Sequence, residues 1–256
     1  MTDAAVTPDV AIPRVGRSVV AALLMGLSIQ FLGTLSWVAM IRLNASQRPD
    51  VPWAAAAMGC WLFVMVAWLG GRGGPRGTQQ FRRFHLRVWR PQPGAWSGDN
   101  LTTIVSLIGA MAGLYVLYVL MGSRRAPVDV SAYSLALRWS ALLMGPVVAG
   151  VVEEVAFRGY MQSHLERIGP TFAILVTSAT FALLHASQGL GYLLTLAPGL
   201  FLASVVFGHL ALKSGSILPG MALHVAGDTA YAYFALPGGD PALLFAGLTN
   251  ASRIVG

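Results

Sequence analysis

The hydrophobic positions of the chain fall into long blocks that contain few charged residues. A helix needs about 20 consecutive apolar residues to span a bilayer. Seven blocks meet or approach that length: residues 19–41, 51–70, 101–122, 132–152, 171–184, 190–212 and 217–236. A last apolar stretch, residues 242–248, is too short to cross unaided. The pattern predicts an all-α, polytopic membrane protein with about seven to eight transmembrane helices.

Composition supports a membrane protein, because 55% of the residues are apolar, only 11% are charged and the mean hydropathy is +0.65. The N-terminal stretch does not have the pattern of a cleaved signal peptide. The single cysteine, Cys60, excludes an intrachain disulfide and a multi-cysteine metal site. No second soluble domain is indicated.

The net charge of +7 is concentrated in the one long connection, residues 71–100. It carries Arg72, Arg76, Arg82, Arg83, Arg87 and Arg90. Basic residues accumulate in cytoplasmic loops, so we place this connection and the N-terminus in the cytoplasm of a multi-pass protein of the plasma membrane. The preference for arginine over lysine suggests a high-GC bacterial genome.

Within that connection, residues 81–90 mix arginine with phenylalanine and tryptophan. This mixture favours an interfacial helix on an anionic lipid leaflet, so the lipid bilayer is the expected partner. Nucleic-acid binding is not expected.

Six ionisable residues interrupt or closely follow the later apolar blocks. They are Glu153, Glu154 and Arg158 in VVEEVAFRGYM (151–161), His185 at the end of FALLH (181–185), and His224 and Asp228 in HVAGD (224–228). An ionisable group at mid-membrane costs about 2.5–3.5 kcal/mol, so it usually faces a cavity or a partner and marks function.

Helical spacing suggests how these groups act. Glu154 and Arg158 are i and i+4, so they can pair on one helix face and leave Glu153 without a partner in its own helix. An unpaired carboxylate suits proton abstraction from water, and His185 could share that water. His224, oriented by Asp228 one turn later, could donate a hydrogen bond to an oxyanion. Together the groups predict a hydrolase.

Purely structural roles remain possible for each group. The Glu154–Arg158 pair could simply neutralise charge, and Glu153 could be solvated at a helix end. His185 could be a core histidine bonded to a carbonyl oxygen. His224 with Asp228 could form a buried hydrogen bond between helices.

The groups can meet only if they lie at the same depth. If the fourth helix continues through residues 157–168, Glu153 lies 15 residues from its end, and His185 is about as far from the start of the fifth block. Fifteen helical residues span about 22 Å. We therefore predict a long, tilted fourth helix.

The three motifs in this order resemble the CAAX prenyl protease and bacteriocin-processing (CPBP, or Abi) family of intramembrane proteases. The family pattern of Glu-Glu-x-x-x-Arg, Phe-x-x-x-His and His-x-x-x-Asn is matched at 153–158, 181–185 and 224–228, with Asp228 in place of the asparagine. The resemblance covers about residues 135–235. It implies a catalytic helical core over residues 131–236. The transmembrane helices expected over residues 1–130 follow from hydropathy alone, and residues 237–256 are left as a C-terminal tail.

The resemblance implies peptide-bond hydrolysis within the membrane, near the C-terminus of a membrane-embedded or lipidated peptide or protein. In the family the first glutamate and the second-motif histidine activate water, which corresponds to Glu153 and His185. The last motif lines the oxyanion site, which corresponds to His224 and Asp228. An ionised aspartate cannot donate to an oxyanion, so Asp228 would have to be protonated, orient His224 or bind a metal.

The need for a metal is open in this family, whose members are commonly described as metalloproteases. Glu153, His185 and His224 would match a catalytic zinc set. The chain lacks a His-Glu-x-x-His run and Glu153 can act as a base alone, so the favoured mechanism requires no cofactor.

Two other function classes compete with an intramembrane endopeptidase. The first is a non-proteolytic scaffold or bacteriocin-immunity protein of the same family, which would not need Glu153, His185 and His224 together. The second is a small transporter with Glu153 as proton carrier, but no inverted repeat is visible. Prenylated CAAX proteins, peptide pheromones, bacteriocin precursors and membrane-protein tails are all open as substrates.

Overall fold

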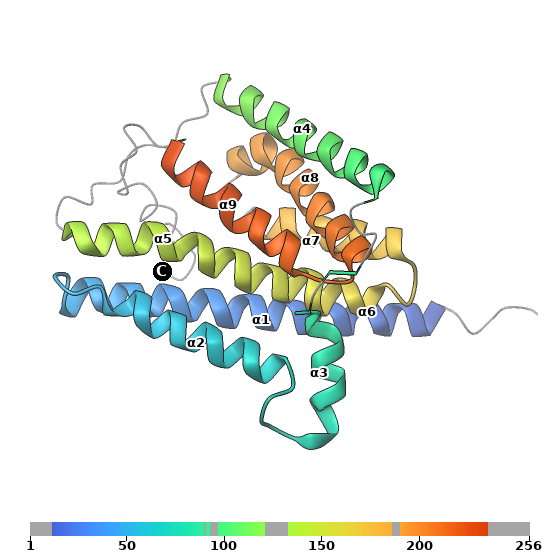
Figure 1. The fold of residues 1–256 in the computed structure, drawn as a ribbon, viewed down its shortest axis with the longest axis horizontal. Helices are drawn as coiled ribbons and strands as arrows, with labels where there is room; N and C mark the ends of the chain where they lie inside the picture. The colour runs from blue at the N-terminus through green and yellow to red at the C-terminus, as the bar shows by residue number, and fades with distance from the viewer. Residues whose placement is uncertain (1–11, 90, 93–96, 121–132, 186–189, 235–256) are drawn as a thin grey trace, which may run out of the picture.

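The computed structural model describes residues 12–89, 91–92, 97–120, 133–185 and 190–234, and this part of the chain is built of helices without a β-strand (Figure 1). The elements are α1 (Ile12–Gln47), α2 (Trp53–Leu69), the 3-10 turn η1 (Arg76–Thr78), α3 (Gln79–Leu86), α4 (Gly98–Leu120), α5 (Leu135–Glu153), the π-helical segment η2 (Glu154–Gln162), α6 (Ser163–Leu165), α7 (Pro170–Leu184), α8 (Leu190–Ser214) and α9 (Leu218–Phe234). The all-α prediction is confirmed.

Each of the seven predicted apolar blocks overlaps one helix of at least 15 residues. Three described stretches are long and apolar enough to cross a membrane: Val15–Gln47, Leu135–Leu165 and Ala197–Ser214. Two shorter apolar helices, Trp53–Leu69 and Pro170–Leu184, accompany them. The helices are therefore compatible with a membrane protein, whereas the count of seven to eight spans stays a prediction. The apolar stretch 242–248 and the tail 237–256 lie outside the described residues.

The predicted long fourth helix is confirmed. It begins after Ser134, whose hydroxyl accepts a hydrogen bond from the Leu137 amide. The helical run then continues without interruption through α5, η2 and α6 to Leu165. It ends three residues before the predicted limit, because residues 166–168 form a turn and Pro170 starts α7.

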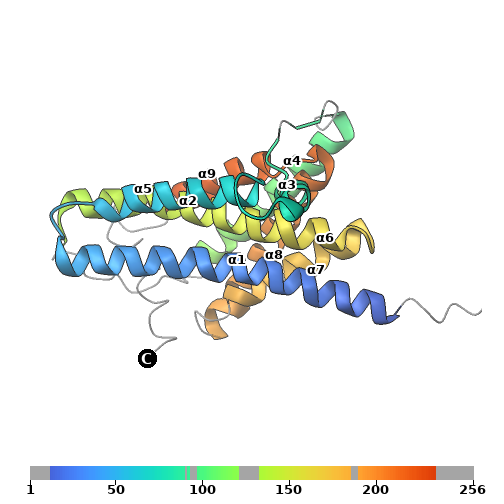
Figure 2. The same cartoon turned by 90° about the horizontal axis from the view of Figure 1, so that it is seen from below.

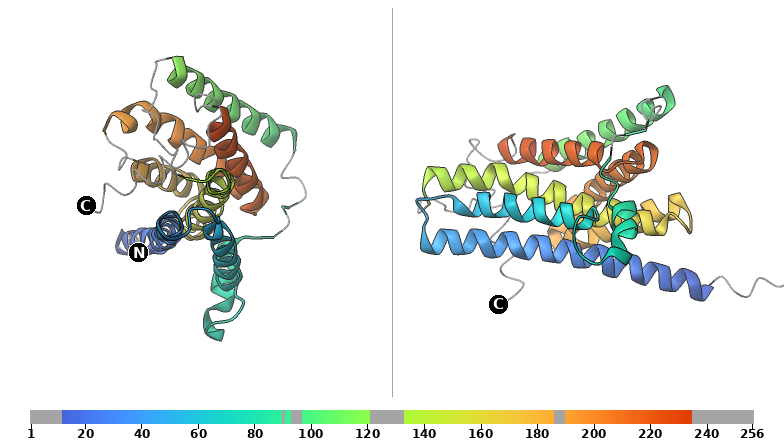
Figure 3. Two further views of the ribbon diagram at one scale, coloured as in Figure 1. Left: turned by 90° about the vertical axis from the view of Figure 1, so that its left-hand side faces the viewer. Right: turned by 60° about the horizontal axis from the view of Figure 1, so that its bottom comes forward.

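Helices α1, α2 and α5 lie side by side along the length of the bundle, with α1 spanning almost all of it (Figures 1 and 2). Helices α4, α8 and α9 lie on the other side of α5 (Figure 3). Segment η2 is at the centre, since it packs against α1, α3, α7 and α8 as well as α5. All nine residues of η2 are buried. π-Helical turns within a helix are frequent at functional sites.

Two glycines allow the neighbouring helices to approach α5 closely. A Cβ atom at Gly33 of α1 would lie 2.5 Å from Val152 Cγ1, and one at Gly150 of α5 would collide with Val225 of α9. Small residues at such contacts are the usual way to bring membrane helices together. These two contacts hold α1 and α9 against the end of α5, where the glutamates lie.

Helix α3 leaves the bundle at a steep angle (Figures 1 and 3). It is anchored to η2 and α6: Tyr160 donates to the carbonyl oxygens of Leu69 and Arg82 at 3.0 and 3.3 Å, and His85 Nδ1 lies 2.6 Å from Ser163 Oγ. The predicted helix is present only in part, because α3 ends at Leu86 and residues 87–89 are not helical. Arg82, His85 and Leu86 of α3 are buried against protein, and its position on a lipid leaflet stays a prediction.

His85 gives the fold a pH dependence. Burial, followed by the nearby positive charges of His164, Arg167 and Arg87, lowers its pKa to about 4. An unfolded histidine has a pKa near 6.5, so protonation favours the unfolded chain. We expect stability to be full above about pH 6.5 and to fall as the pH drops towards 4, by about 2 kcal/mol between pH 7 and pH 5.

Thermal unfolding in mild detergent at pH 7 and pH 5 measures this effect. The His85→Gln variant should lose less stability on acidification than the wild type, since it lacks the titrating group. An equal loss in both proteins would show that His85 does not carry the effect.

Candidate active site

The structure brings five of the six candidate residues into one polar group, and among these described residues only His185 makes no hydrogen bond or ion pair with the others. Glu153 ends α5 and Glu154 begins η2, so the two carboxylates leave the same helical run in different directions. His224 comes from α9 and faces both carboxylates. Arg158 lies one helical turn beyond Glu154 and contacts it.

Glu154 is the centre of this group. Its Oε1 accepts a hydrogen bond from Arg158 Nη1 at 2.8 Å, and His224 Nδ1 lies 3.0 Å from the same oxygen. Neither side chain of the Glu154–Arg158 pair is exposed. The predicted pairing within the helix is therefore confirmed, although it is only part of the Glu154 environment. Gly220 of α9 leaves space here, because a Cβ atom at that position would lie 3.0 Å from Glu154 Oε2.

Arg158 also connects the group to α8. Its Nη2 donates to Ser204 Oγ at 2.6 Å and to the Ser204 carbonyl oxygen at 3.2 Å. The guanidinium lies 5.0 Å from the ring centre of Phe181 and 5.1 Å from that of Phe207, within the range of cation–π attraction. The charge of Arg158 is thus compensated by a carboxylate, a serine and aromatic rings. Arg158 therefore lies inside the helical bundle.

His224 is oriented by Glu154 rather than mainly by Asp228. The Glu154 contact at Nδ1 is the short one, whereas Nε2 lies 3.6 Å from Asp228 Oδ2. The prediction of Asp228 as the orienting partner considered only residues one turn apart within α9. It overlooked the close packing of α9 on α5 at Gly150, which brings a carboxylate of another helix nearer. The Asp228 side chain remains 43% exposed.

Glu153 has its closest polar contact outside its own helix. Gln30 of α1 donates from Nε2 to Glu153 Oε1 at 3.3 Å and also contacts Thr34. Glu153 Oε2 faces His224 Nε2 at 3.7 Å, and 13% of the Glu153 side chain is exposed. Sequence reasoning missed Gln30, whose only signal is a polar amide inside the first apolar block.

His185 lies at the end of α7, half-buried, with Nδ1 2.8 Å from the Phe181 carbonyl oxygen. The Phe181 ring contacts both histidines, at 4.8 Å from the His185 ring centre and 6.1 Å from that of His224. The contact between His185 and a carbonyl oxygen is the one expected of a structural histidine. No hydrogen bond between the described residues joins His185 to Glu153, so their shared water stays a prediction.

A chain of polar contacts therefore joins five elements of the bundle: α8, η2, α9, α5 and α1. It runs from Ser204 of α8 through Arg158, Glu154 and His224 to Glu153, and ends on Gln30 of α1. Within a bilayer, buried polar groups have to find such partners inside the protein. In this arrangement Glu154 holds Nδ1 of His224, while Nε2 faces the partly exposed carboxylates of Glu153 and Asp228.

The structure does not show a preformed metal site at the three residues that would bind zinc, which are Glu153, His185 and His224. In the ranges that the structure describes, no three or more His, Cys, Asp or Glu side chains are placed to hold one metal ion. The need for a metal stays a prediction, and no step below is assigned to a metal.

One family of known proteins matches the part of the chain that contains this site. Residues 135–230 match the family model of Rce1-like proteins, described as type II CAAX prenyl endopeptidase Rce1-like. No curated protein and no solved structure matches the chain. The matched stretch contains all six candidate residues, whereas Gln30 lies outside it. The resemblance to the CAAX protease family is therefore confirmed over residues 135–230, where the chain is similar to type II CAAX prenyl endopeptidase Rce1-like proteins.

Proposed function

We propose that this protein is an intramembrane endopeptidase that hydrolyses a peptide bond near the C-terminus of a membrane-associated substrate. A prenylated CAAX-type protein is the substrate class to test first. One observation carries the proposal: Glu153 Oε2 faces His224 Nε2 at 3.7 Å, while Glu154 holds the other ring nitrogen of His224. The Rce1-like match over the same residues supports it.

Glu153 is the proposed general base. A water molecule about 2.8 Å from both Glu153 Oε2 and His224 Nε2 is geometrically possible. When this water attacks the carbonyl carbon of the substrate, Glu153 takes its proton. That proton then passes to the leaving amine as the carbon–nitrogen bond breaks, which restores the Glu153 carboxylate.

His224 is the proposed oxyanion donor. With Nδ1 held by Glu154, a protonated ring can donate from Nε2 to the negative oxygen of the tetrahedral intermediate. The carboxylates of Glu154 and Asp228, at opposite nitrogens, balance the charge of that ring. In this proposal Asp228 supports His224 and does not itself contact the oxyanion. His185 remains a proposed second contact for the water.

Glu154 and Arg158 are proposed as positioning residues. Both are fully buried, and their contacts with each other and with Ser204 are short, so neither is available to a substrate. Their function would be to hold the His224 ring. Zinc is the alternative to a cofactor-free mechanism, and the assay below includes a chelator for that reason.

The test is cleavage of a quenched, prenylated CAAX peptide by the full chain purified in detergent. The unprenylated peptide of the same sequence serves as control, and a chelator is added in a parallel arm. Release of the last three residues from the prenylated peptide supports the proposal. Turnover that survives the chelator supports the mechanism without metal. If neither this peptide nor any other is cleaved, a non-proteolytic scaffold or immunity protein becomes the better account.

We further propose a multi-pass protein of the plasma membrane, with seven to eight spans and a cytoplasmic N-terminus. The proposal is supported by contacts that bring the Arg-rich connection next to the α6–α7 turn and the α8–α9 turn, at one end of the bundle. Arg87 pairs with Glu166 after α6, and the Arg87 carbonyl oxygen accepts from the Ile217 amide at the α8–α9 turn. The Arg48–Asp50 pair lies at the α1–α2 turn, at the other end of α1. Cysteine accessibility on either side of the membrane tests the orientation.

Gln30 is expected to matter for activity although it lies outside the matched domain. A hydrogen bond to a charged group contributes about 1.5–3 kcal/mol. Gln30→Leu should therefore lower kcat of peptide hydrolysis by about tenfold or more, while KM changes little, because Glu153 loses its orienting donor. Thr34→Val, which removes the other partner of Gln30, is the matched control. Steady-state kinetics that show equal effects in both variants would refute the role of Gln30.

A further inference from the structure

A cavity of about 610 Å³ lies between the end of α2 and α3, on elements separate from the candidate active site. One wall is apolar and includes Phe63, Val66 and Leu86. Arg72 and Arg83 line the cavity as well. Its volume is in the range of small-molecule sites in proteins, and its lining combines an apolar wall with two cationic groups.

The arginines of this region differ in whether their charge is already used. Arg82 is buried, donates to the carbonyl oxygens of Trp68 and Gly73 and lies over the Trp68 ring. Arg87 pairs with Glu166. In contrast, the exposed side chains of Arg72 and Arg83 have no hydrogen bond or ion pair with any described residue.

No carboxylate of the same segment neutralises these two arginines, since residues 71–92 contain neither Asp nor Glu. Both guanidinium groups are therefore available for an anion within the cavity they line. Guanidinium groups bind phosphate through paired hydrogen bonds, so a phosphate is the anion that this chemistry suits best.

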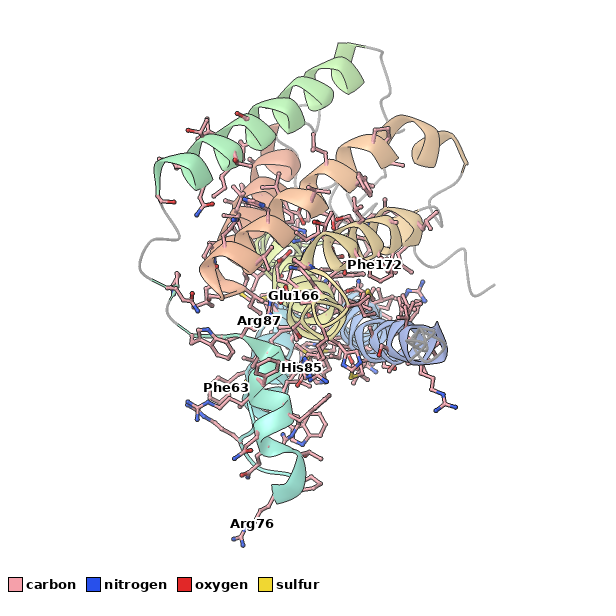
Figure 4. All side chains as sticks on the ribbon, turned by 90° about the vertical axis from the view of Figure 1, so that its right-hand side faces the viewer. Phe63, Arg76, His85, Arg87, Glu166 and Phe172 are labelled. Atoms are coloured by element: carbon pink, nitrogen blue, oxygen red, sulfur yellow. The ribbon has the colours of Figure 1, made fainter. Side chains whose placement is uncertain are left out.

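The apolar wall of the cavity continues onto a surface that suits lipid. Phe63 is 69% exposed and Val64, next to it on α2, is 63% exposed. Figure 4 shows Phe63 close to α3. Arg76, in the turn η1 that precedes α3, lies farther from the bundle and points away from it. A ligand held here would contact cations with one end and an exposed apolar helix face with the other.

We propose that this cavity binds one anionic phospholipid, with its phosphate between Arg72 and Arg83 and an acyl chain along Phe63 and Val66. The net positive charge of the cavity favours an anionic headgroup over a zwitterionic one. The bound lipid would also contact α3, which is anchored to η2 through Tyr160 and to α6 through His85. This inference does not depend on the proposed peptidase activity.

Native mass spectrometry of the full chain in detergent tests the proposal, with phosphatidylglycerol and phosphatidylcholine titrated separately. We expect one molecule of phosphatidylglycerol to be retained in preference. Arg72→Gln and Arg83→Gln should each weaken that binding about fivefold, and Arg76→Gln, which removes the same charge outside the cavity, should leave it unchanged.

Three results would overturn the site. The first is equal retention of the two lipids, and the second is equal weakening by Arg76→Gln and the cavity variants. The third is competition by free glycerol phosphate at lipid-like concentrations, which would indicate a soluble phosphate ligand instead of a lipid.

Discussion

Glu153→Gln is expected to lower kcat of peptide hydrolysis by about 10²–10⁴-fold, the range that general-base catalysis contributes. Glutamine has nearly the same shape and its Oε1 can still accept the hydrogen bond that Gln30 donates to Glu153. The variant therefore removes the proton acceptor and keeps the orientation. Turnover of the peptide that the wild type cleaves measures the effect.

The matched control is Asp50→Asn, which neutralises an exposed carboxylate at the α1–α2 turn that pairs with Arg48. It should leave kcat unchanged. Thermal unfolding of both variants should resemble that of the wild type, because the Glu153 carboxylate is partly exposed and its closest hydrogen bond is a long one of 3.3 Å. A Glu153→Gln protein with wild-type turnover would remove Glu153 from the mechanism.

Arg158→Met is expected to destabilise the fold by about 3–5 kcal/mol, since it leaves the Glu154 carboxylate buried without its cation. The exposed fraction of both side chains is 0%, so solvent cannot replace the lost partner. Arg48→Met is the control, because it breaks the Arg48–Asp50 pair, whose side chains are 64% exposed, and should change stability by no more than about 1 kcal/mol.

The double variant Glu154→Gln, Arg158→Met separates the ion pair from general packing. Once both charges are gone, the double variant should be less destabilised than the sum of the single variants. Chemical unfolding in mild detergent measures all four proteins of the cycle. Additive effects, or an Arg158→Met change as small as that of Arg48→Met, would contradict a coupled buried pair.

Local spacing predicted what lies within one helix. The run from Leu135 to Leu165 and the Glu154–Arg158 pair follow from apolar length and from i, i+4 geometry, and both are present. The site could be located for the same reason, because ionisable residues in apolar blocks are costly and therefore few.

Contacts between different helices could not be predicted from spacing within one helix. The partner of His224 proved to be Glu154 of another helix, and Glu153 contacts Gln30, which is more than 120 residues away in the chain. Both contacts depend on how closely α1 and α9 approach α5 at Gly33 and Gly150. A single sequence does not show which of its many glycines serve such contacts.

We propose that the group around Glu153 and His224 hydrolyses peptide bonds, whatever the natural substrate. The most direct test of this proposal is incubation of a diverse peptide library with the wild type and with Glu153→Gln, followed by mass spectrometry of newly formed C-termini. We expect new C-termini with the wild type and almost none with the variant. The same new C-termini from both proteins, or none from the wild type, would contradict the proposal.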